Sequence, residues 1–400
     1  MVRSVESLNV KERRVFVRTD YNVPLTEDGA VRDDFRIQAS LPTIRYLLEQ
    51  GAAVILASHL GRPKGERVPS MSLAPVARRL SELLGIDVQF APDCVGDEVS
   101  RMASGLKAGQ VLLLENLRYH KAETDNDAAF SAELARLADV YVNDAFGTAH
   151  RAHASNVGMA AHFEERGAGY LLMKEIDFLV NAIESPKRPF TVVMGGSKIS
   201  GKIDLLKRLA EKADNILIGG GMAFTFLAAP PVNQDVGDSL VETDKLEFAS
   251  EVMALCADKG VNLVLPSDTV AAAEISDDAE SQTIPIRALE NGLMGLDIGQ
   301  ATTQTFAKVL AESKTVLWNG PMGVFESKPF AEGTRAIAEQ LVALTQQGVI
   351  TIVGGGDSAA ALKQFGLDGG VAHTSTGGGA SLELLSGVDL PAFEALKGDK

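Results

Sequence analysis

The chain is poor in cysteine and has no long hydrophobic run. Cys94 and Cys256 are its only cysteines, and they are far apart without the spacing of a metal site. We therefore expect two reduced thiols and no zinc site. Apolar runs such as Val54–Ala57 are far shorter than the roughly 20 residues that a membrane helix needs. The first residues also lack the apolar segment of a signal peptide, so we expect a cytoplasmic protein without a membrane partner.

An excess of positive charge is also missing, because the net charge is −15. This balance argues against a nucleic-acid partner. The charge is uneven: residues 1–170 hold 20 Lys and Arg against 23 Asp and Glu, while residues 171–400 hold 18 against 30. Five of the six histidines precede residue 163. Arginine and histidine placed at particular loops of an acidic chain indicate that its first half holds a small anion.

Short β-rich runs alternate with amphipathic stretches along the chain, which is typical of parallel α/β sheets. Most runs are nearly continuous in apolar residues, as expected when helices cover both faces of a sheet. The predicted strands are Val15–Arg18, Val54–Ser58, Val111–Glu115, Val140–Asn143, Thr191–Met194, Asn215–Ile218, Asn262–Leu265, Thr315–Trp318 and Val349–Val353. We therefore predict an α/β fold of two doubly wound, Rossmann-like parallel-sheet domains with a cleft between them.

The length of 400 residues suggests two domains rather than one core. Leu171–Ile183 has apolar residues at helical spacing, and Ser185–Pro189 then breaks the pattern. We predict a first domain over residues 1–170, an interdomain helix over 171–185 and a second domain that begins at 186.

Each predicted strand of the first half leads into a segment that carries arginine or histidine. These segments are Thr19–Pro24, His59–Pro63, Asn116–His120 and Asp144–His153, and Arg36 could join them. Ligands of open α/β sheets bind beyond the carboxyl ends of the strands, and guanidinium groups suit phosphate or carboxylate. A single arginine of this kind is usually a surface ion pair, but several on successive strands predict an anion site. His150 and His153 fit this site or a capping or core role equally well.

Glycine-rich segments punctuate the second half, and most of them follow predicted strands. They are Gly195–Gly196, Gly219–Gly221, Gly320 with Gly323, Gly354–Gly356 and Gly377–Gly379. Glycine lets backbone N–H groups approach an anion closely and leaves the next helix start open to phosphate. The second half therefore predicts phosphate binding through the backbone.

The segment Gly196–Lys202 has the spacing of a Walker A loop. Ile203 stands where that loop needs a hydroxyl for Mg²⁺, and no convincing Walker B aspartate accompanies it, so we interpret the match as coincidental. Lys198 and Lys202 still favour phosphate, because a lysine near a helix start opposes the macrodipole and needs an anion nearby.

Two further segments add polar groups to the glycine turns. In Gly354–Ser358, Asp357 could hold Mg²⁺, while Ser358 could cap the helix or donate to phosphate. Asn319–Glu326 offers an apolar strip and a carboxylate that would suit a nucleoside. Thr376–Gly379 is another possible anion site at a helix start.

Taken together, these segments closely resemble the phosphoglycerate kinase family. The motifs that carry the resemblance are RTDYNVP from Arg18, HLGRP from His59, ENLR from Glu115, NDAFGTAHR from Asn143, GGSKI from Gly195, NGPMGVFE from Asn319, GGGDS from Gly354 and STGGGASLE from Ser375. They occur in the family's usual order over nearly the full length, so the match is highly specific.

The resemblance implies a monomeric glycolytic enzyme that transfers a phosphoryl group between 1,3-bisphosphoglycerate and ADP, giving 3-phosphoglycerate and ATP, with Mg²⁺. Its implied substrate residues are Asp20, Tyr21, Asn22, Arg36, His59, Leu60, Gly61, Arg62, Arg118 and Arg151. The implied nucleotide residues are Gly195, Lys198, Lys202, Gly295, Asn319, Pro321, Glu326, Gly355, Gly356, Asp357 and Ser358, with Asp357 as the metal ligand. The implied catalytic residues are Arg36, Lys202, Gly355 and Gly378. The nucleotide domain would span residues 186–375, and residues 376–400 would return to the first domain.

The chain departs from the family pattern at three places. Ser358 replaces the commoner threonine, Leu293 stands where tryptophan is frequent, and Ser200-Gly201 precedes Lys202 where an acidic residue is usual. The last change would alter the rigidity of the loop beside Lys202.

Three other functions fit parts of the sequence. A P-loop NTPase would need a hydroxyl at 203, and a dinucleotide dehydrogenase would need a G-x-G-x-x-G segment that Gly219–Gly221 does not supply. A non-catalytic binding protein could keep the arginines but gives no reason for Lys198, Lys202 and Asp357.

Overall fold

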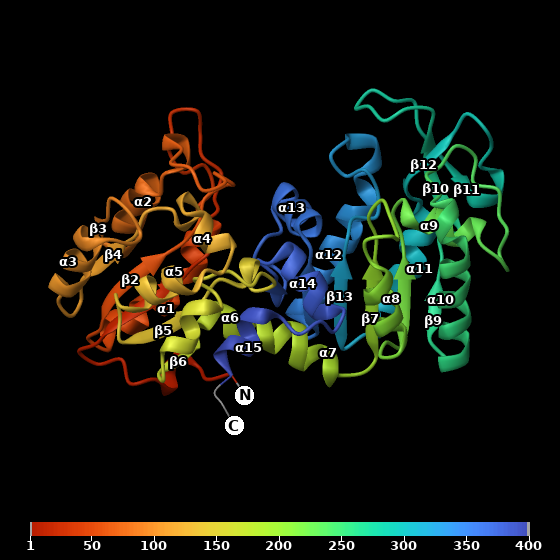
Figure 1. Ribbon diagram of the computed structural model, residues 1–400. Coiled ribbons are helices and arrows are strands. Elements are labelled where there is room, and N and C mark those ends of the chain that lie inside the picture. Colours follow the sequence, from red (N-terminus) through yellow and green to blue (C-terminus); the bar gives the residue numbers. More distant parts are fainter. Residues whose placement is uncertain (1, 398–400) are drawn as a thin grey trace. The chain divides into compact units, whose positions relative to one another are not determined.

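The computed structural model describes residues 2–397, which pack as two units (Figure 1). The first unit comprises Met1–Ile176 and Asp389–Lys400, and the second comprises Asp177–Val388. The division falls inside the segment 171–185 that the sequence predicts as an interdomain helix. Residues 1 and 398–400, at the ends of the predicted first domain and of the returning segment, lie outside the described residues.

The first unit is built on one six-stranded sheet with the order β3-β4-β2-β1-β5-β6. All of its neighbouring strands are parallel. The strands are β1 (Arg14–Arg18), β2 (Ala53–Ala57), β3 (Val88–Phe90), β4 (Val111–Leu113), β5 (Val140–Asn143) and β6 (Arg166–Ala168). The four strands that the sequence predicts for this half are therefore direct neighbours in the centre of the sheet.

Helices flank this sheet. They are α1 (Phe35–Glu49), α2 (Ala74–Leu84), α3 (Asp97–Gly105), α4 (Lys121–Thr124), α5 (Ala128–Ala135), α6 (Tyr170–Ile176) and α15 (Pro391–Leu396). Helix α2 ends at Gly85, whose φ of 69° lies in the left-handed region that glycine adopts without strain. Helix α15 packs against β6, and its Ala392 N–H donates to the Ala149 carbonyl at 3.1 Å. The end of the described chain is thereby anchored on the first unit.

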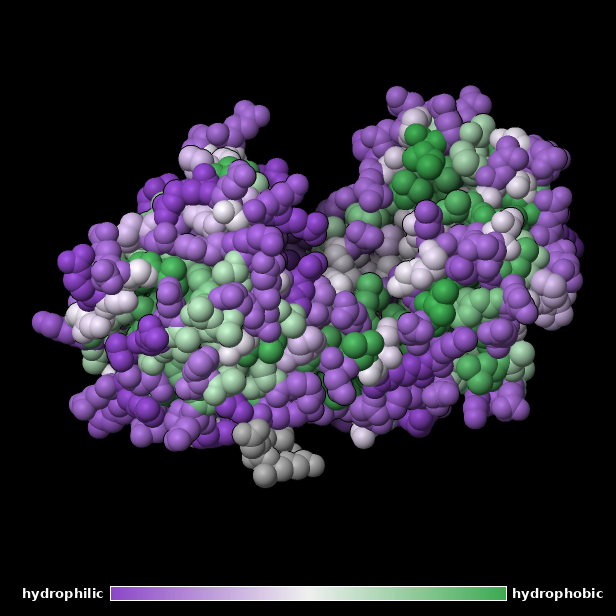
Figure 2. Space-filling view, viewed as in Figure 1, coloured by the Kyte–Doolittle hydropathy of each residue, from purple (hydrophilic) through white to green (hydrophobic). Residues whose placement is uncertain are grey.

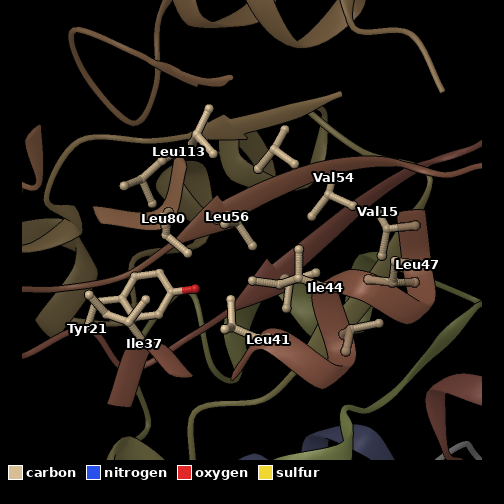
Figure 3. Packing of buried hydrophobic residues seen from close by; sticks show 14 of the residues in the cluster. Val15, Tyr21, Ile37, Leu41, Ile44, Leu47, Val54, Leu56, Leu80 and Leu113 are labelled. Carbon is tan, nitrogen blue, oxygen red and sulfur yellow. The ribbon is translucent and has the colours of Figure 1, made fainter. Parts of the chain in front are cut away.

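The core of the first unit lies between the sheet and helices α1 and α2 (Figure 3). Val15, Val54 and Leu56 from the strands meet Ile44 and Leu47 of α1. All five side chains are fully buried, and their apolar surface supplies the main driving force for packing helix on sheet.

The second unit contains a six-stranded parallel sheet and a smaller antiparallel one. The parallel sheet has the order β15-β14-β13-β7-β8-β9, and the antiparallel sheet has the order β11-β10-β12. The strands are β7 (Phe190–Met194), β8 (Asn215–Ile218), β9 (Asn262–Val264), β10 (Asp268–Ala272), β11 (Gln282–Pro285), β12 (Met294–Ile298), β13 (Thr315–Asn319), β14 (Ile350–Gly354) and β15 (His373–Thr374). Two parallel sheets with flanking helices confirm the predicted fold class.

The helices of the second unit pack against one another and on its parallel sheet. They are α7 (Ala182–Glu184), α8 (Ile203–Ala210), α9 (Met222–Ala228), α10 (Leu246–Lys259), α11 (Gln300–Ala311), α12 (Glu332–Gln346), α13 (Gly356–Gln364) and α14 (Gly378–Leu385). Trp318 at the end of β13 is fully buried, and its indole N–H donates to the Gly320 carbonyl at 2.8 Å. This bond ties the apolar core to the glycine turn that follows the strand.

Hydrophilic residues cover most of the visible surface, and hydrophobic ones reach it in separate groups (Figure 2). Within residues 2–397, no helix combines the length and the apolar character that crossing a bilayer requires.

Several elements differ from the sequence-based expectation. The stretch predicted as one helix over Leu171–Ile183 is interrupted, because α6 gives way to a π-helical turn at Asp177–Asn181 before α7. Strands β3, β6, β10, β11, β12 and β15 were not predicted. Polar residues or glycine interrupt each of these strands, and β11 is largely exposed, so they lack the continuous apolar run on which the other predictions depend.

We expect Leu56→Ala to lower the free energy of unfolding by about 2–5 kcal/mol, because it leaves a cavity in the core of the first unit. Chemical denaturation would measure the change. Ile86→Ala is the control, since Ile86 is 37% exposed and should cost much less. Equal losses for the two variants would contradict the core described above.

Candidate functional site

The first unit gathers polar side chains at the carboxyl ends of four adjacent strands. Asp20 follows β1, His59 follows β2, Arg118 follows β4, and Arg151 follows β5. These strands occupy neighbouring positions in the sheet, so all four groups emerge along one edge. The arrangement is the one that the strand-end pattern predicts.

A pocket of about 490 Å³ lies at this edge. It is lined by Arg62, Lys64, Gly65, Arg118, Lys121, Thr124, Arg151 and His153. The sequence predicted the three arginines but not the two lysines. Each lysine lies within three residues of a predicted arginine, and that proximity was the only signal that could have identified it.

Arg118 illustrates the electrostatics of this pocket. Its Nη1 donates to the Gly61 carbonyl at 2.9 Å, while its buried Nε has no hydrogen-bond partner among the described residues. Burial, together with the charges of Arg18 and Arg151, lowers the pKa of Arg118 to about 10. An anion in the pocket would supply both the missing acceptor and the missing negative charge.

The two histidines beside the arginines are neutral. Burial and then the Arg18 charge hold the pKa of His59 well below its usual range, and the same causes lower the pKa of His153 to about 3. His153 is buried and lines the pocket, so of the alternatives left open for it the structure supports a place in the site. His150 belongs to the same segment, Asp144–His153, and is half-buried.

The loop after β1 is held by polar contacts. Arg36, in the first turn of α1, forms an ion pair with Asp20, and the Asn22 side-chain carbonyl accepts the Gly61 N–H at 2.9 Å. Tyr21 instead points into the core, where its hydroxyl bonds to Ser40 at 2.8 Å (Figure 3). Its side chain is fully buried, so only its backbone is available to a ligand.

Leu60 is likewise buried, which leaves its backbone as the part that shapes this edge. Its carbonyl accepts from Asn116 Nδ2 at 2.7 Å, and its N–H donates to Asn116 Oδ1 at 3.2 Å. These two bonds fix the start of the turn that carries Gly61 and Arg62.

In the second unit, glycine turns converge at the ends of β7, β13 and β14. The Gly195 N–H donates to the Asn319 carbonyl at 3.0 Å, and the Gly196 N–H donates to the Pro321 carbonyl at 2.7 Å. A Cβ on Gly195 would lie 2.1 Å from the Pro321 oxygen, so only glycine fits there. The turns at Gly195–Gly196 and Gly320 thus form one compact cradle.

Lys202 lies across this cradle. It occupies the position just before α8, and its Nζ donates to the carbonyls of Gly195 at 2.6 Å and Asn319 at 3.0 Å. Burial lowers the pKa of Lys202 to about 8, and the charge of Asp357 opposes that shift. Lys198 is exposed in the loop before α8.

Asn319 and Ser358 complete the cradle in different ways. The Asn319 Nδ2 is buried without a hydrogen-bond partner among residues 2–397, which leaves a donor for a ligand. The Ser358 hydroxyl accepts the Gly320 N–H at 2.7 Å. The prediction that Ser358 caps its helix is wrong, since α13 begins at Gly356 with Gly355 before it, and the buried serine instead ties two glycine turns together.

Asp357 is the residue that could hold a metal ion in this unit. It is exposed in the first turn of α13, and its charge acts on Lys202. Mg²⁺ keeps several waters and binds through one or two carboxylates together with phosphate oxygens. An exposed carboxylate whose charge acts on Lys202 fits that requirement.

The other predicted nucleotide residues occupy several elements of the second unit. Gly295 is buried in β12, where a Cβ would lie 2.0 Å from the ring of Phe224. Glu326 is exposed after β13, and Gly378 begins α14 with a φ of 35°. Among residues 2–397, no hydrogen bond joins these three residues to Lys202 or to the turns at Gly195 and Gly320.

One cluster of potential metal ligands occurs among the described residues, where sequence spacing gave no indication of it. Donor atoms of Asp93, Cys94 and His120 lie within 4.8 Å of one another. The Asp93 carboxylate already bonds to His120 Nε2 at 2.7 Å and pairs with Arg67 at 3.1 Å. Burial also raises the pKa of the Cys94 thiol well above its usual value, so the group is satisfied as a hydrogen-bonded cluster.

Residues 5–388 match the model of the family described as phosphoglycerate kinase. The chain belongs to the phosphoglycerate kinase family. It is therefore a phosphotransferase whose acceptor is a carboxyl group, as the resemblance implied.

Individual relatives agree over nearly the whole chain. The cytosolic phosphoglycerate kinase of Triticum aestivum is 54% identical and covers 98% of both sequences. Phosphoglycerate kinase 1, chloroplastic, of Arabidopsis thaliana is also 54% identical, over 99% of this chain and 82% of its own. The solved phosphoglycerate kinase of Coxiella burnetii aligns over 99% of both chains with a TM-score of 0.90 and 41% identity.

We expect the stability contribution of Lys202 to rise with pH. The folded chain releases the Lys202 proton near pH 8, whereas an unfolded lysine does so near pH 10.4, so between these values the unfolded state binds more protons and stability increases. Relative to Lys202→Met, the wild type should gain on the order of 1 kcal/mol between about pH 7.5 and 9.5 in denaturant titrations.

Lys259→Met provides the control for this titration, since Lys259 is exposed at the end of α10. Its stability difference from the wild type should stay flat over the same interval. A flat difference for Lys202→Met as well would contradict the burial of its ammonium group.

Proposed function

We propose that the chain catalyses reversible, Mg²⁺-dependent phosphoryl transfer between 1,3-bisphosphoglycerate and ADP, giving 3-phosphoglycerate and ATP. One observation carries this proposal: each unit holds its own phosphate-type site, and the two sites use different chemistry. The first is a pocket of arginines and lysines at strand ends, and the second is a glycine cradle crossed by Lys202. Two phosphorylated reactants that each bind one unit account for both.

Phosphoryl transfer to a carboxylate requires no general base. A carboxylate is already ionised at neutral pH, since its ordinary pKa is near 3.5–4. Catalysis then depends on aligning the reactants and neutralising charge on the moving phosphoryl group. Neutral His59 and His153 suit this chemistry, because they can orient a substrate without adding charge.

We assign the phosphoglycerate reactant to the first unit. Arg62, Arg118 and Arg151 would hold its phosphate in the pocket, and Asp20, Asn22 and His59 would orient the rest. Arg36 would contact the carboxylate and the transferring phosphoryl group. The ion pair between Arg36 and Asp20 holds the guanidinium at this edge before substrate arrives.

We assign the nucleotide to the second unit. Lys202, the Asn319 amide and the N–H groups near Gly355 would receive its phosphates, and Asp357 would hold Mg²⁺. When bound, this ion would neutralise phosphate charge. Gly295 and Glu326 would contact the nucleoside, and Gly378 would be a catalytic residue at the start of α14. These three assignments come from family motifs.

A coupled assay that measures ATP formed from ADP and 1,3-bisphosphoglycerate tests the proposal. We expect turnover with Mg²⁺ and loss of turnover when a chelator removes it. ATP hydrolysis without phosphoglycerate would favour a P-loop NTPase, and binding without turnover would favour a non-catalytic protein. Either outcome would overturn the proposed function.

In this assay, Arg36→Ala and Lys202→Ala should each lower turnover by at least about 10²-fold, the scale of one lost transition-state donor. Arg101→Ala and Lys259→Ala are matched controls, because both side chains are exposed on helices and neither lines the pocket or bonds to the Lys202 cradle. Near-normal turnover with either test variant would remove the role assigned to that residue.

Since each reactant belongs to its own unit, the units must approach each other for transfer. We expect small-angle scattering to show a smaller radius of gyration with both 3-phosphoglycerate and a non-hydrolysable ATP analogue than with either alone. An unchanged radius would count against hinge closure while leaving the two separate assignments intact.

Cytoplasmic residence and a monomeric state are part of the same proposal. The first is supported by a similar plant protein described as cytosolic, whereas another is described as chloroplastic. The second rests on family resemblance alone.

A further inference from the structure

One buried carboxylate lies behind the pocket of the first unit and has no part in the mechanism above. Glu123 of α4 is 0% exposed. Its Oε2 accepts the Ser155 N–H at 2.9 Å, its Oε1 accepts the Ser155 hydroxyl at 2.6 Å, and His153 Nδ1 lies 3.8 Å from Oε1. A buried carboxylate lowers the stability of the fold unless donors and cations compensate its charge. The burial of Glu123 therefore suggests a specific role.

The Ser155 hydroxyl connects this carboxylate to an arginine. Because it gives its single hydrogen to Glu123, its oxygen is free to accept, and it does so from Arg18 Nε at 2.8 Å. Arg18 ends β1 and is fully buried. Its Nη1 donates to the Thr19 carbonyl, and its Nη2 lies 3.5 Å from His59 Nδ1.

Two routes therefore lead from Glu123 to the pocket edge. One runs through Ser155 and Arg18 to His59, whose ring also lies 3.9 Å from Asp20. The other runs directly to His153, which lines the pocket. Every polar group on both routes belongs to the first unit, and Glu123, Ser155 and Arg18 are all fully buried.

The charge of Glu123 matters as well as its hydrogen bonds. The pocket edge concentrates the positive charges of Arg18, Arg118 and Arg151, which repel one another. Glu123 and Asp20 are the negative groups that act on Arg118 in this cluster. Of the two, only Glu123 is completely buried. Solvent ions therefore screen its charge least.

We propose that Glu123 is a positioning residue for the phosphoglycerate site: through Ser155 it sets the orientation of Arg18 and thereby of His59, and its charge balances the arginines before substrate binds. This inference rests on the proposed function, because it takes the pocket as the phosphoglycerate site. Glu123 itself does not touch the pocket and takes no part in bond making.

Ser155→Ala tests the hydrogen-bonded route. It removes the hydroxyl but keeps the N–H that Glu123 accepts. We expect the KM for 3-phosphoglycerate to rise about tenfold, the scale of one hydrogen bond to a charged group, while the KM for ATP and kcat change by less than about threefold. A coupled assay of the reverse direction, from 3-phosphoglycerate and ATP with purified full-length chain, supplies all three constants.

Ser131→Ala is the matched control. Ser131 is also buried in the first unit, but its hydroxyl donates to the Asp127 carbonyl at the start of α5 rather than toward the arginines. It should lower thermal stability to a similar degree and leave both KM values unchanged. If Ser155→Ala behaves like Ser131→Ala, or raises both KM values alike, the route through Arg18 is overturned.

Glu123→Gln tests the charge, since it keeps the shape of the side chain. Bound 3-phosphoglycerate would replace the missing negative charge, so this ligand should raise the melting temperature of Glu123→Gln by more than that of the wild type. An equal or smaller shift would overturn the balancing role. A wild-type chain without phosphoglycerate kinase turnover would instead reject the proposed function, so the two failures are distinguishable.

Discussion

The parallel direction of the strands is the constraint on which the rest of the structure depends. In a parallel sheet every strand ends at the same edge, so residues far apart in the chain meet there without any long-range signal in their spacing. Asp20 and Arg151 are separated by more than a hundred residues, yet they follow adjacent strands. The second unit applies the same rule to glycine turns, and Gly195 and Asn319 meet through one backbone hydrogen bond.

The two units solve the problem of holding phosphate in opposite ways. The first uses side chains, so it must keep several like charges close together in partly buried positions, and neutral histidines limit that repulsion. The second uses backbone groups, which carry no net charge, and adds Lys202, whose ammonium group donates to two carbonyls. The first arrangement is held by electrostatic balance and the second by steric fit.

Much of the fold and many of the site residues could be predicted from sequence because they depend on local patterns. The central strands have continuous apolar runs, and residues such as Arg118 and Lys202 follow these runs directly. Strand β12 could not be predicted this way, because Gly295 and Asp297 interrupt its apolar residues. The capping role considered for Ser358 was wrong because its partner, Gly320, is 38 residues away in the sequence.

Lys64 and Lys121 show a further limit of sequence reasoning. Nothing in their local pattern separates them from solvated surface lysines, and only the pocket geometry includes them. Family motifs identify residues whose chemistry is shared among the members of the family. They therefore do not identify additional groups such as these two lysines. The same holds for Asp93, Cys94 and His120, which are brought together by the loops after β3 and β4.

The burial of both cysteines has a practical consequence. Cys94 is 0% and Cys256 is 1% exposed, and burial raises the pKa of the Cys256 thiol to about 11. Since thiolates rather than thiols react with alkylating reagents, neither native group should compete with a new cysteine placed on the surface. Fluorophores could therefore be attached at chosen positions in either unit without first removing any residue of the natural chain.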